Sequence, residues 1–320
     1  MAGTVVWEHG NNKDGNNNKK SWLALGTVVQ IALVTDRGTA IMNDAFNMAM
    51  KALRAVEEAC SRFDADSELV RLVHAPIGRA VPVSAILYQC VKFALEVAKW
   101  TDGRFDPTVG ARMEQLGFKR HYLTGELTTS DVQVSEEATF RDIELDEDNQ
   151  AICLHRPLKL DLGAVAKGLA VDLAVRELTA FEFQGFVIDA GGDVYVSGCN
   201  EKSELWQVGI RDPIHHAENI LMLHLTDAAV CTSGTYERKS PVDAKAHHIL
   251  NAHSKESARG LLSVTAIGPY AMMADALSTA AFLYPPNDAV SLLEEAILEG
   301  IVITDDLSCQ MSQGMERYLT

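Results

Sequence analysis

The sequence predicts an α+β protein in which layers of helix and sheet pack on one another. Five segments have the character of helices, and a series of strand-like segments follows between residues 186 and 232 with no helix between them. Helices and strands therefore alternate only in places. This favours a layered α+β fold over a doubly wound parallel sheet.

Helical spacing of apolar residues and clear stop signals define the predicted helices. They span residues 40–63, 84–100, 163–178, 270–283 and 291–298. In the first of them, Phe46, Met50 and Leu53 lie on one face. The fourth stops at Pro285 and Pro286.

The predicted strands are short runs rich in Val, Leu and Ile. They span residues 24–34, 158–162, 186–189, 194–196, 206–210, 220–225, 229–232, 262–267 and 301–304. Residues 101–110 are predicted as a loop, and the polar stretch 119–137 has no strong pattern. Residues 10–20 are polar and turn-rich and cannot bury much apolar area. We therefore expect a flexible N-terminal arm over residues 1–20 and a single domain over residues 21–320.

The charge of the chain excludes two classes of partner. The 320 residues include 28 basic and 44 acidic side chains, which gives a formal net charge of −16. Nucleic acids and anionic membranes both need a basic surface, so we expect neither as a partner. A phosphate-bearing ligand must be held locally, by backbone N–H groups or by a metal ion.

The cysteines and the N-terminus indicate a cytoplasmic protein. The six cysteines are scattered and form no Cys-x-x-Cys motif, which is typical of free thiols in a reducing compartment. Residues 1–20 contain no apolar run long enough for a signal peptide, and no run elsewhere is long enough to insert into a membrane.

Several common catalytic motifs are absent from the sequence. There is no Gly-x-Gly-x-x-Gly, Gly-x-Ser-x-Gly, Ser-x-x-Lys or His-Glu-x-x-His. Gly163 and Gly168 have the spacing of a phosphate loop, but Leu169 and Ala170 follow where Lys and Ser or Thr are required. The sequence therefore disfavours a P-loop enzyme, a serine hydrolase and a zinc protease of the His-Glu-x-x-His type.

Two segments combine acidic residues with glycines next to predicted strands. Residues 160–168, LDLGAVAKG, lead into a helix whose N-terminus can hold an anion, with Lys167 about one turn inside it. The alternative is a plain turn in which Asp161 caps the helix. Residues 189–193, DAGGD, allow close approach of a ligand or form a tight hairpin.

Two later segments carry oxygen ligands and histidines. Asp275 and Thr279 are one helical turn apart with Ser278 beside them, so their oxygens can face a Mg²⁺ ion together. The alternative is that both hydroxyls bond back to the helix and that Asp275 caps it or is solvated. His248 is of a type that acts as a general base near neutral pH, but residues 246–251 also fit a simple edge strand.

Taken together, the segments resemble the ApbE-type FAD:protein FMN transferases, also called flavin transferases, over residues 24–304. The resemblance rests on eight segments in the same order: 25–27 (LGT), 61–69 (SRFDADSEL), 105–110 (FDPTVG), 161–168 (DLGAVAKG), 189–193 (DAGGD), 232–236 (TSGTY), 247–249 (HHI) and 274–279 (ADALST). Each segment is weak alone, and their common order makes the resemblance strong.

The resemblance implies an ApbE or T-fold-like architecture and a Mg²⁺-dependent reaction. The enzyme would cleave the pyrophosphate of FAD, attach FMN through a phosphodiester to a Thr or Ser of an acceptor protein, and release AMP. Two alternatives are a Mg²⁺-dependent FAD pyrophosphatase, which yields FMN and AMP, and a non-catalytic FAD-binding module.

The resemblance also implies roles for individual residues. The metal site would consist of the Ala164 carbonyl and the side chains of Asp275, Ser278 and Thr279. The FAD contacts would come from Leu25, Phe63, Arg104, Phe105, Asp106, Asp161, Lys167 and Ile249. His248 would be the general base that receives the proton of the acceptor hydroxyl.

Overall fold

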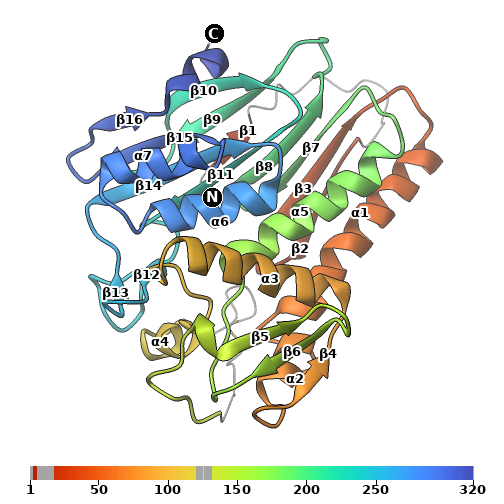
Figure 1. Cartoon of the computed structure of the whole chain (residues 1–320). Coiled ribbons are helices and arrows are strands. Elements are labelled where there is room, and N and C mark those ends of the chain that lie inside the picture. The colour runs from red at the N-terminus through yellow and green to blue at the C-terminus, as the bar shows by residue number, and fades with distance from the viewer. Residues whose placement is uncertain (1–2, 6–17, 120–124, 126–131, 320) are drawn as a thin grey trace.

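The computed structural model describes residues 3–5, 18–119, 125 and 132–319, and it confirms the α+β fold (Figure 1). Its centre is an eight-stranded antiparallel sheet with the order β16–β15–β14–β11–β8–β7–β3–β2. In chain order these strands are β2 (Lys19–Ala24), β3 (Thr27–Val34), β7 (Gly185–Ala190), β8 (Asp193–Gly198), β11 (Ala228–Gly234), β14 (Leu261–Gly268), β15 (Glu299–Thr304) and β16 (Cys309–Met311).

The two faces of this sheet are covered by different layers. Against one face lies a three-stranded sheet of β1 (Gly3–Val5), β9 (Trp206–Arg211) and β10 (Asn219–Leu225). The other face carries the helices α1 (Thr39–Cys60), α5 (Gly163–Thr179) and α6 (Ala271–Ala281), as Figure 1 shows. Every residue of β11 is buried, because apolar side chains pack on both faces of this central strand.

A group of smaller elements packs against α1 and α5 and occupies the lower part of Figure 1. It contains α2 (Glu68–Val73), α3 (Ala85–Trp100), α4 (Gly110–Gln115), η1 (Phe140–Asp142), and a sheet of β4 (Ala80–Pro82), β6 (Ala151–Leu154) and β5 (Ile143–Asp146). Apart from α3, the sequence analysis missed these elements. They are only three to six residues long, too short for a period to be recognised.

The single strand predicted over residues 24–34 is wrong, because the chain forms a hairpin of β2 and β3 there. Leu25 and Gly26 form its two-residue turn, with φ values of 54° and 68°. Two positive φ values are typical of the turn that matches the twist of paired strands. Leucine rarely adopts this conformation, and here its N–H donates a hydrogen bond of 2.8 Å to Oε1 of Glu57 on α1.

The strand predicted over residues 158–162 is also wrong. Leu158, Leu160 and Leu162 are buried, which produces the strand-like alternation. However, the segment pairs at one residue only, where Lys159 forms a bridge with Val109. The alternation of apolar residues therefore reflects burial of the three leucines beside the neighbouring loop. It does not reflect pairing in a sheet.

The remaining predicted helices and strands are confirmed, with shifts at their ends. The last helix, α7 (Pro286–Glu295), begins five residues before the predicted start, because proline fits the first turn of a helix. The other short elements are β12 (Leu250–Asn251), β13 (Glu256–Ser257) and η2 (Gln313–Tyr318). No helix in the described part of the chain is both long and apolar enough to cross a lipid bilayer.

The predicted N-terminal arm contains two pieces of strand. Gly3–Val5 form β1, and β2 already begins at Lys19 rather than near Ser21. The rest of the predicted arm, residues 6–17, lies outside the described residues, as does most of the polar stretch 119–137. The flexible arm therefore stays a prediction for residues 6–17.

Helices α5 and α6 approach each other closely. A Cβ atom on Gly168 of α5 would lie 2.4 Å from the carbonyl oxygen of Ala271 and 2.5 Å from Cα of Met272. One turn further along α5, the carboxylate of Asp172 accepts hydrogen bonds from the N–H groups of Ala271 (2.7 Å) and Met272 (2.9 Å). Burial raises the pKa of Asp172 to about 6. This carboxylate caps the N-terminus of α6 and fixes it against α5.

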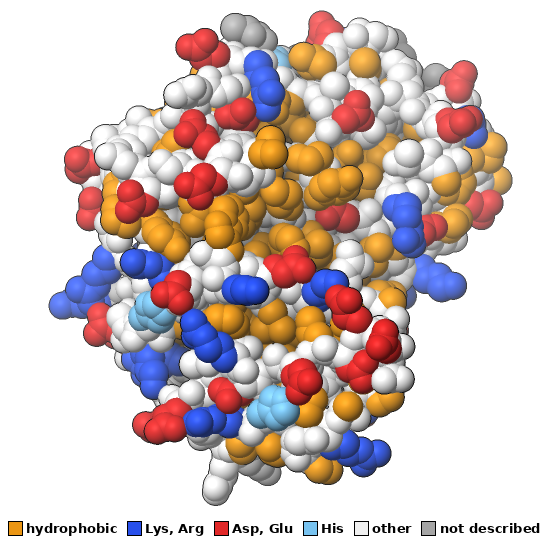
Figure 2. All heavy atoms as spheres, viewed as in Figure 1, with side chains coloured by type: hydrophobic (Ala, Val, Ile, Leu, Met, Phe, Trp, Pro, Cys, Tyr) orange, Lys and Arg blue, Asp and Glu red, His pale blue; other side chains and the backbone are white. Residues whose placement is uncertain are grey.

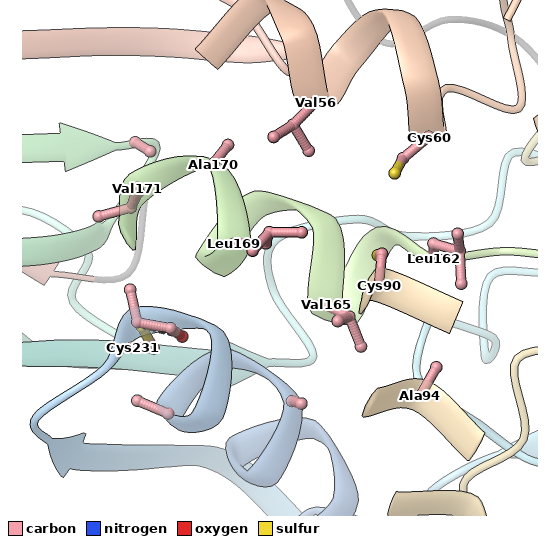
Figure 3. Close-up of a cluster of buried hydrophobic side chains, with 14 of the residues drawn as sticks. Val56, Cys60, Cys90, Ala94, Leu162, Val165, Leu169, Ala170, Val171 and Cys231 are labelled. Carbon is pink, nitrogen blue, oxygen red and sulfur yellow. Dashed lines mark hydrogen bonds between the residues drawn. The ribbon is translucent and has the colours of Figure 1, made fainter. Parts of the chain in front are cut away.

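The opposite sides of α5 pack against α1 and α3. Figure 3 shows Val56 and Cys60 of α1 above the helix and Cys90 and Ala94 of α3 below it, with Val165 and Leu169 between them. Since α5 contacts three other helices, its N-terminus is held firmly in place.

We predict that Gly168→Ala lowers the free energy of unfolding by about 1–3 kcal/mol, because the added methyl group meets backbone atoms of α6. Urea denaturation measures this loss. The matched control is Gly38→Ala at the N-cap of α1, where nothing lies within 4 Å of the new Cβ and the loss should stay below about 1 kcal/mol. Equal losses in the two variants would contradict the close packing of α5 on α6.

Candidate functional site

Two cavities meet at the N-terminus of α5, and we call them together the cleft. They share Asp161, Gly163, Lys167 and Arg238. The first lies between the β2–β3 turn and the end of α1, and the second lies between residues 105–109, β11 and α6.

The structure brings eleven of the thirteen predicted site residues into the lining of the cleft. They are Leu25, Phe63, Phe105, Asp106, Asp161, Ala164, Lys167, His248, Ile249, Asp275 and Thr279. The other two are Arg104, whose guanidinium lies 4.7 Å from the ring centroid of Tyr284, and Ser278, which is fully buried.

The ammonium group of Lys167 lies between two buried carboxylates. Its Nζ is 3.0 Å from Oδ2 of Asp275 and also contacts Oδ2 of Asp193. Asp193 and Asp275 are only 4% and 6% exposed. Asp275 additionally accepts the N–H of Gly168 at 3.2 Å, and Asp193 accepts the N–H of Thr232 at 3.2 Å.

This arrangement has a clear electrostatic consequence. Burial raises the pKa of Asp275, and the neighbouring Lys167 ammonium opposes that rise. Two carboxylates without solvent need a positive charge beside them. Lys167, which the sequence analysis expected to face an anionic ligand, supplies that charge in this structure.

Hydroxyl groups of β11 and α6 lie next to the carboxylates. The Ser233 hydroxyl is 2.9 Å from that of Ser278 and 2.8 Å from that of Thr279. Ser278 also donates to the carbonyl oxygen of Asp275 at 2.9 Å, which is the back-bonding that the sequence left open as an alternative.

The donors in this part of the cleft fit a hard divalent cation. The Asp275 carboxylate, the Thr279 hydroxyl and residue Ala164 with its backbone carbonyl all line the same cavity, and Asp193 adds a second carboxylate. Oxygen donors of these kinds are the ones that Mg²⁺ takes from proteins. The position of the Lys167 ammonium indicates that positive charge is favourable there.

Arg62 organises the side of the cleft formed by the first cavity. Its Nε lies 2.7 Å from Oδ2 of Asp161, and its Nη2 donates to the Phe118 carbonyl at 2.5 Å. The guanidinium lies 4.2 Å from the ring centroid of Phe63. The other oxygen of Asp161 accepts the N–H of Gly163 at 2.9 Å, so Asp161 also caps the start of α5.

Asp106 holds the loop that precedes α4. Its Oδ1 accepts the N–H and the hydroxyl of Thr108, both at 2.8 Å, and its Oδ2 accepts the N–H of Phe140 at 3.0 Å. Burial raises the pKa of this carboxyl group despite these bonds. Asp106 therefore fixes the backbone that places Phe105 in the cleft.

His248 lines the second cavity of the cleft. Its backbone N–H donates to the Arg238 carbonyl at 3.2 Å, and the ring nitrogen Nδ1 lies 3.4 Å from the same oxygen. This contact favours the tautomer with the proton on Nδ1, which leaves Nε2 as the acceptor. Burial lowers the pKa of His248 to about 3, and Arg238 and His247 add to the decrease, so the ring is neutral.

Four residues of the site were missed by the sequence analysis: Arg62, Asp193, Ser233 and Arg238. The first three belong to the eight segments that carry the family resemblance, and Arg238 lies two residues after the segment 232–236. The segments marked the correct part of the chain. The contacts within the site, however, join residues that are far apart in the sequence. Lys167 and Asp275, for example, are separated by 108 positions.

Comparisons with known proteins agree with one another. The model of the ApbE family matches residues 25–302. The FAD:protein FMN transferase of Treponema pallidum is 30% identical over 319 residues, covering 92% of this chain and 86% of that protein. The enzyme of the same name from Haemophilus influenzae is 25% identical over 283 residues, covering 85% and 82%.

Solved structures show the same fold. The crystal structure of the ApbE protein from Thermotoga maritima superposes with a TM-score of 0.83 at 28% identity, covering 94% of this chain and 99% of that one. The flavin transferase ApbE from Vibrio cholerae has a TM-score of 0.81 at 22% identity, covering 94% and 98%.

We predict that His248 contributes to acid destabilisation. An unfolded histidine has a pKa near 6.5, whereas the pKa of folded His248 is about 3. Between these values the unfolded chain binds a proton that the folded chain does not. The free energy of unfolding then falls as the pH decreases, by at most about 1.4 kcal/mol per pH unit for this one group.

Urea denaturation at pH values from about 7.5 down to about 5 tests this prediction. His248→Gln should flatten the decrease in the unfolding midpoint below about pH 6.5, with the values near pH 7.5 as the reference for each protein. An unchanged slope in the variant would mean that the pKa of His248 is not lowered in the folded chain.

Proposed function

This chain belongs to the ApbE family and is an FAD:protein FMN transferase, and we propose how its cleft performs the reaction. FAD binds in the cleft as the substrate, with Mg²⁺ at the Asp275 end. FMN is transferred to a Thr or Ser hydroxyl of an acceptor flavoprotein, and AMP is released. The observation that carries the proposal is the Asp193–Lys167–Asp275 group facing the cleft beside His248.

The apolar residues of the cleft would contact the ring systems of FAD. Leu25 and Phe63 offer apolar surface in the first cavity, and Phe105 and Ile249 do so in the second. Asp161 lies where the two cavities meet. Arg104 and Asp106 act mainly by holding the loop, since each is already engaged by other parts of the chain.

The metal site would be formed by the Ala164 carbonyl, the Asp275 carboxylate and the Thr279 hydroxyl. The Ser278 hydroxyl, which bonds Ser233 and the Asp275 carbonyl, would have to exchange partners to join them. When bound, Mg²⁺ would neutralise the pyrophosphate and stabilise the leaving AMP. Lys167 would then be able to turn from the carboxylates toward a phosphate oxygen.

His248 would accept the proton of the acceptor hydroxyl at Nε2. The hydroxyl oxygen forms a bond to the phosphorus of the FMN moiety, the bond from that phosphorus to the AMP oxygen breaks, and the proton moves to His248. A pKa of about 3 makes the free histidine a weak base. The negative charge of a bound pyrophosphate opposes the effect of Arg238 and raises that pKa.

The acceptor would be a cytoplasmic protein. The free state of all six cysteines supports this proposal, because scattered free thiols are typical of reducing compartments. The acidic overall charge supports a protein partner rather than a nucleic acid.

We predict that AMP is released from FAD in the presence of Mg²⁺ only when an acceptor domain with a suitable Thr is supplied. The measurement is AMP by chromatography together with a fluorescent covalent flavin band on a denaturing gel. His248→Gln should still bind FAD but should transfer it about 100-fold to 10,000-fold more slowly.

Other outcomes of this experiment separate the alternatives. Equal AMP release without the acceptor would indicate the FAD pyrophosphatase. FAD binding with no AMP under either condition would indicate a binding module. Loss of FAD affinity in His248→Gln would make His248 a binding residue and contradict its role as a base.

We predict that Asp275→Asn weakens Mn²⁺ binding by at least about tenfold, because it removes the charged ligand of the proposed metal site, and loss of a residue that only orients a ligand already costs about 10-fold to 100-fold. Electron paramagnetic resonance of free Mn²⁺ measures the affinity without reference to activity. The matched control is Asp288→Asn on the exposed first turn of α7, which should bind Mn²⁺ as the parent does. Equal affinity in Asp275→Asn and the parent would contradict the metal assignment.

A further inference from the structure

The β5–β6 hairpin carries three potential metal ligands of different kinds on one face. Glu144 of β5 lies opposite Cys153 of β6 in the strand register. His155 follows two residues after Cys153, so its side chain is directed to the same side of the hairpin. None of the three lines the cleft.

The donor atoms of these residues converge on one point. One carboxylate oxygen, the thiol sulfur and one imidazole nitrogen all lie within 4.8 Å of one another. Oε2 of Glu144 lies 2.8 Å from Nε2 of His155. Among the described residues, this is the one group of three such side chains at that spacing.

A simple ion pair does not account for the whole arrangement. It explains the approach of Glu144 to His155, but it gives no role to the sulfur of Cys153 at the same point. Cys153 is fixed in the middle strand of its sheet, where Ala80 and Glu144 are its register partners. Glu144 and His155 are exposed and can adjust around it.

The donor set selects a class of metal ion. A thiolate, an imidazole and a carboxylate are the ligands that Zn²⁺ takes, at about 2.0–2.3 Å. Tetrahedral geometry then requires donor atoms about 3.5 Å apart. The observed donor atoms lie within 4.8 Å of one another, and the side chains of Glu144 and His155 are exposed, so they can rotate toward that spacing. Water would fill the fourth position. Mg²⁺ avoids sulfur and nitrogen ligands, so this site differs in kind from the cleft.

We propose that Glu144, Cys153 and His155 bind one divalent metal ion of the Zn²⁺ class. Binding displaces the thiol proton of Cys153 to solvent and forms a metal–sulfur bond. The ion links β5 to β6 next to η1. The N–H of Phe140 in η1 donates to Asp106, so the site stabilises the part of the chain that holds the loop of the cleft.

Titration of the tag-free full chain with Co²⁺ tests this proposal. We expect one Co²⁺ per chain to give a thiolate-to-cobalt charge-transfer band and the visible spectrum of a tetrahedral ion, whereas Co²⁺ bound among the oxygen donors of the cleft gives no such band. Cys153→Ser should abolish the charge-transfer band. His155→Gln changes only an exposed side chain and should weaken binding at least tenfold. Added Zn²⁺ should displace Co²⁺ and raise the unfolding midpoint of the parent but not of Cys153→Ser.

Two control variants locate the site. Cys309→Ser removes the exposed thiol of β16, and Asp275→Asn alters the cleft, so both should keep the charge-transfer band. The proposal is wrong if the parent shows no such band. It is also wrong if Cys153→Ser and His155→Gln retain the band, or if Cys309→Ser loses it.

Discussion

The contact of the Lys167 ammonium with the carboxylates of Asp193 and Asp275 joins the three elements on which the cleft depends. Lys167 lies on α5, Asp193 starts β8 and Asp275 lies on α6. Both carboxylates are buried, and a positive charge beside them is needed to offset the free-energy cost of removing them from water. Their relative positions follow from how closely α5 packs on α6, so Gly168 and Asp172 shape the cleft without lining it.

The balance of charge in the cleft explains why a metal ion suits it. The basic residues that line it are Arg62, Lys167 and Arg238, and the acidic ones are Glu57, Asp106, Asp161, Asp193, Glu237 and Asp275. The cleft thus holds no excess of positive charge for a pyrophosphate, and the chain as a whole carries −16. The divalent cation that we propose would supply that charge at the point where the carboxylates converge.

Prediction of the fold from the sequence succeeded for elements that a local pattern of apolar residues defines. It failed for elements that depend on contacts between residues far apart in the sequence. The long helices follow from apolar spacing, and the consecutive strands correctly indicated an α+β sheet. The turn at Leu25 could not be predicted, because the Glu57 carboxylate that binds its N–H lies on another element. The site behaved in the same way: sequence segments located Asp161 and Asp275, whereas the contact of Arg62 with Asp161 exists only in the folded chain.

Asp161 shows how one residue can serve both the fold and the proposed binding of FAD. Its two oxygens accept hydrogen bonds from the N–H of Gly163 and from Arg62, which fixes the carboxylate in the lining of both cavities. Each carboxylate oxygen has a second lone pair, so each can still accept a bond from a ligand. A group held in this way loses little conformational entropy when the ligand binds. The contacts that fix Asp161 within the fold would therefore also prepare it for the FAD binding that we propose.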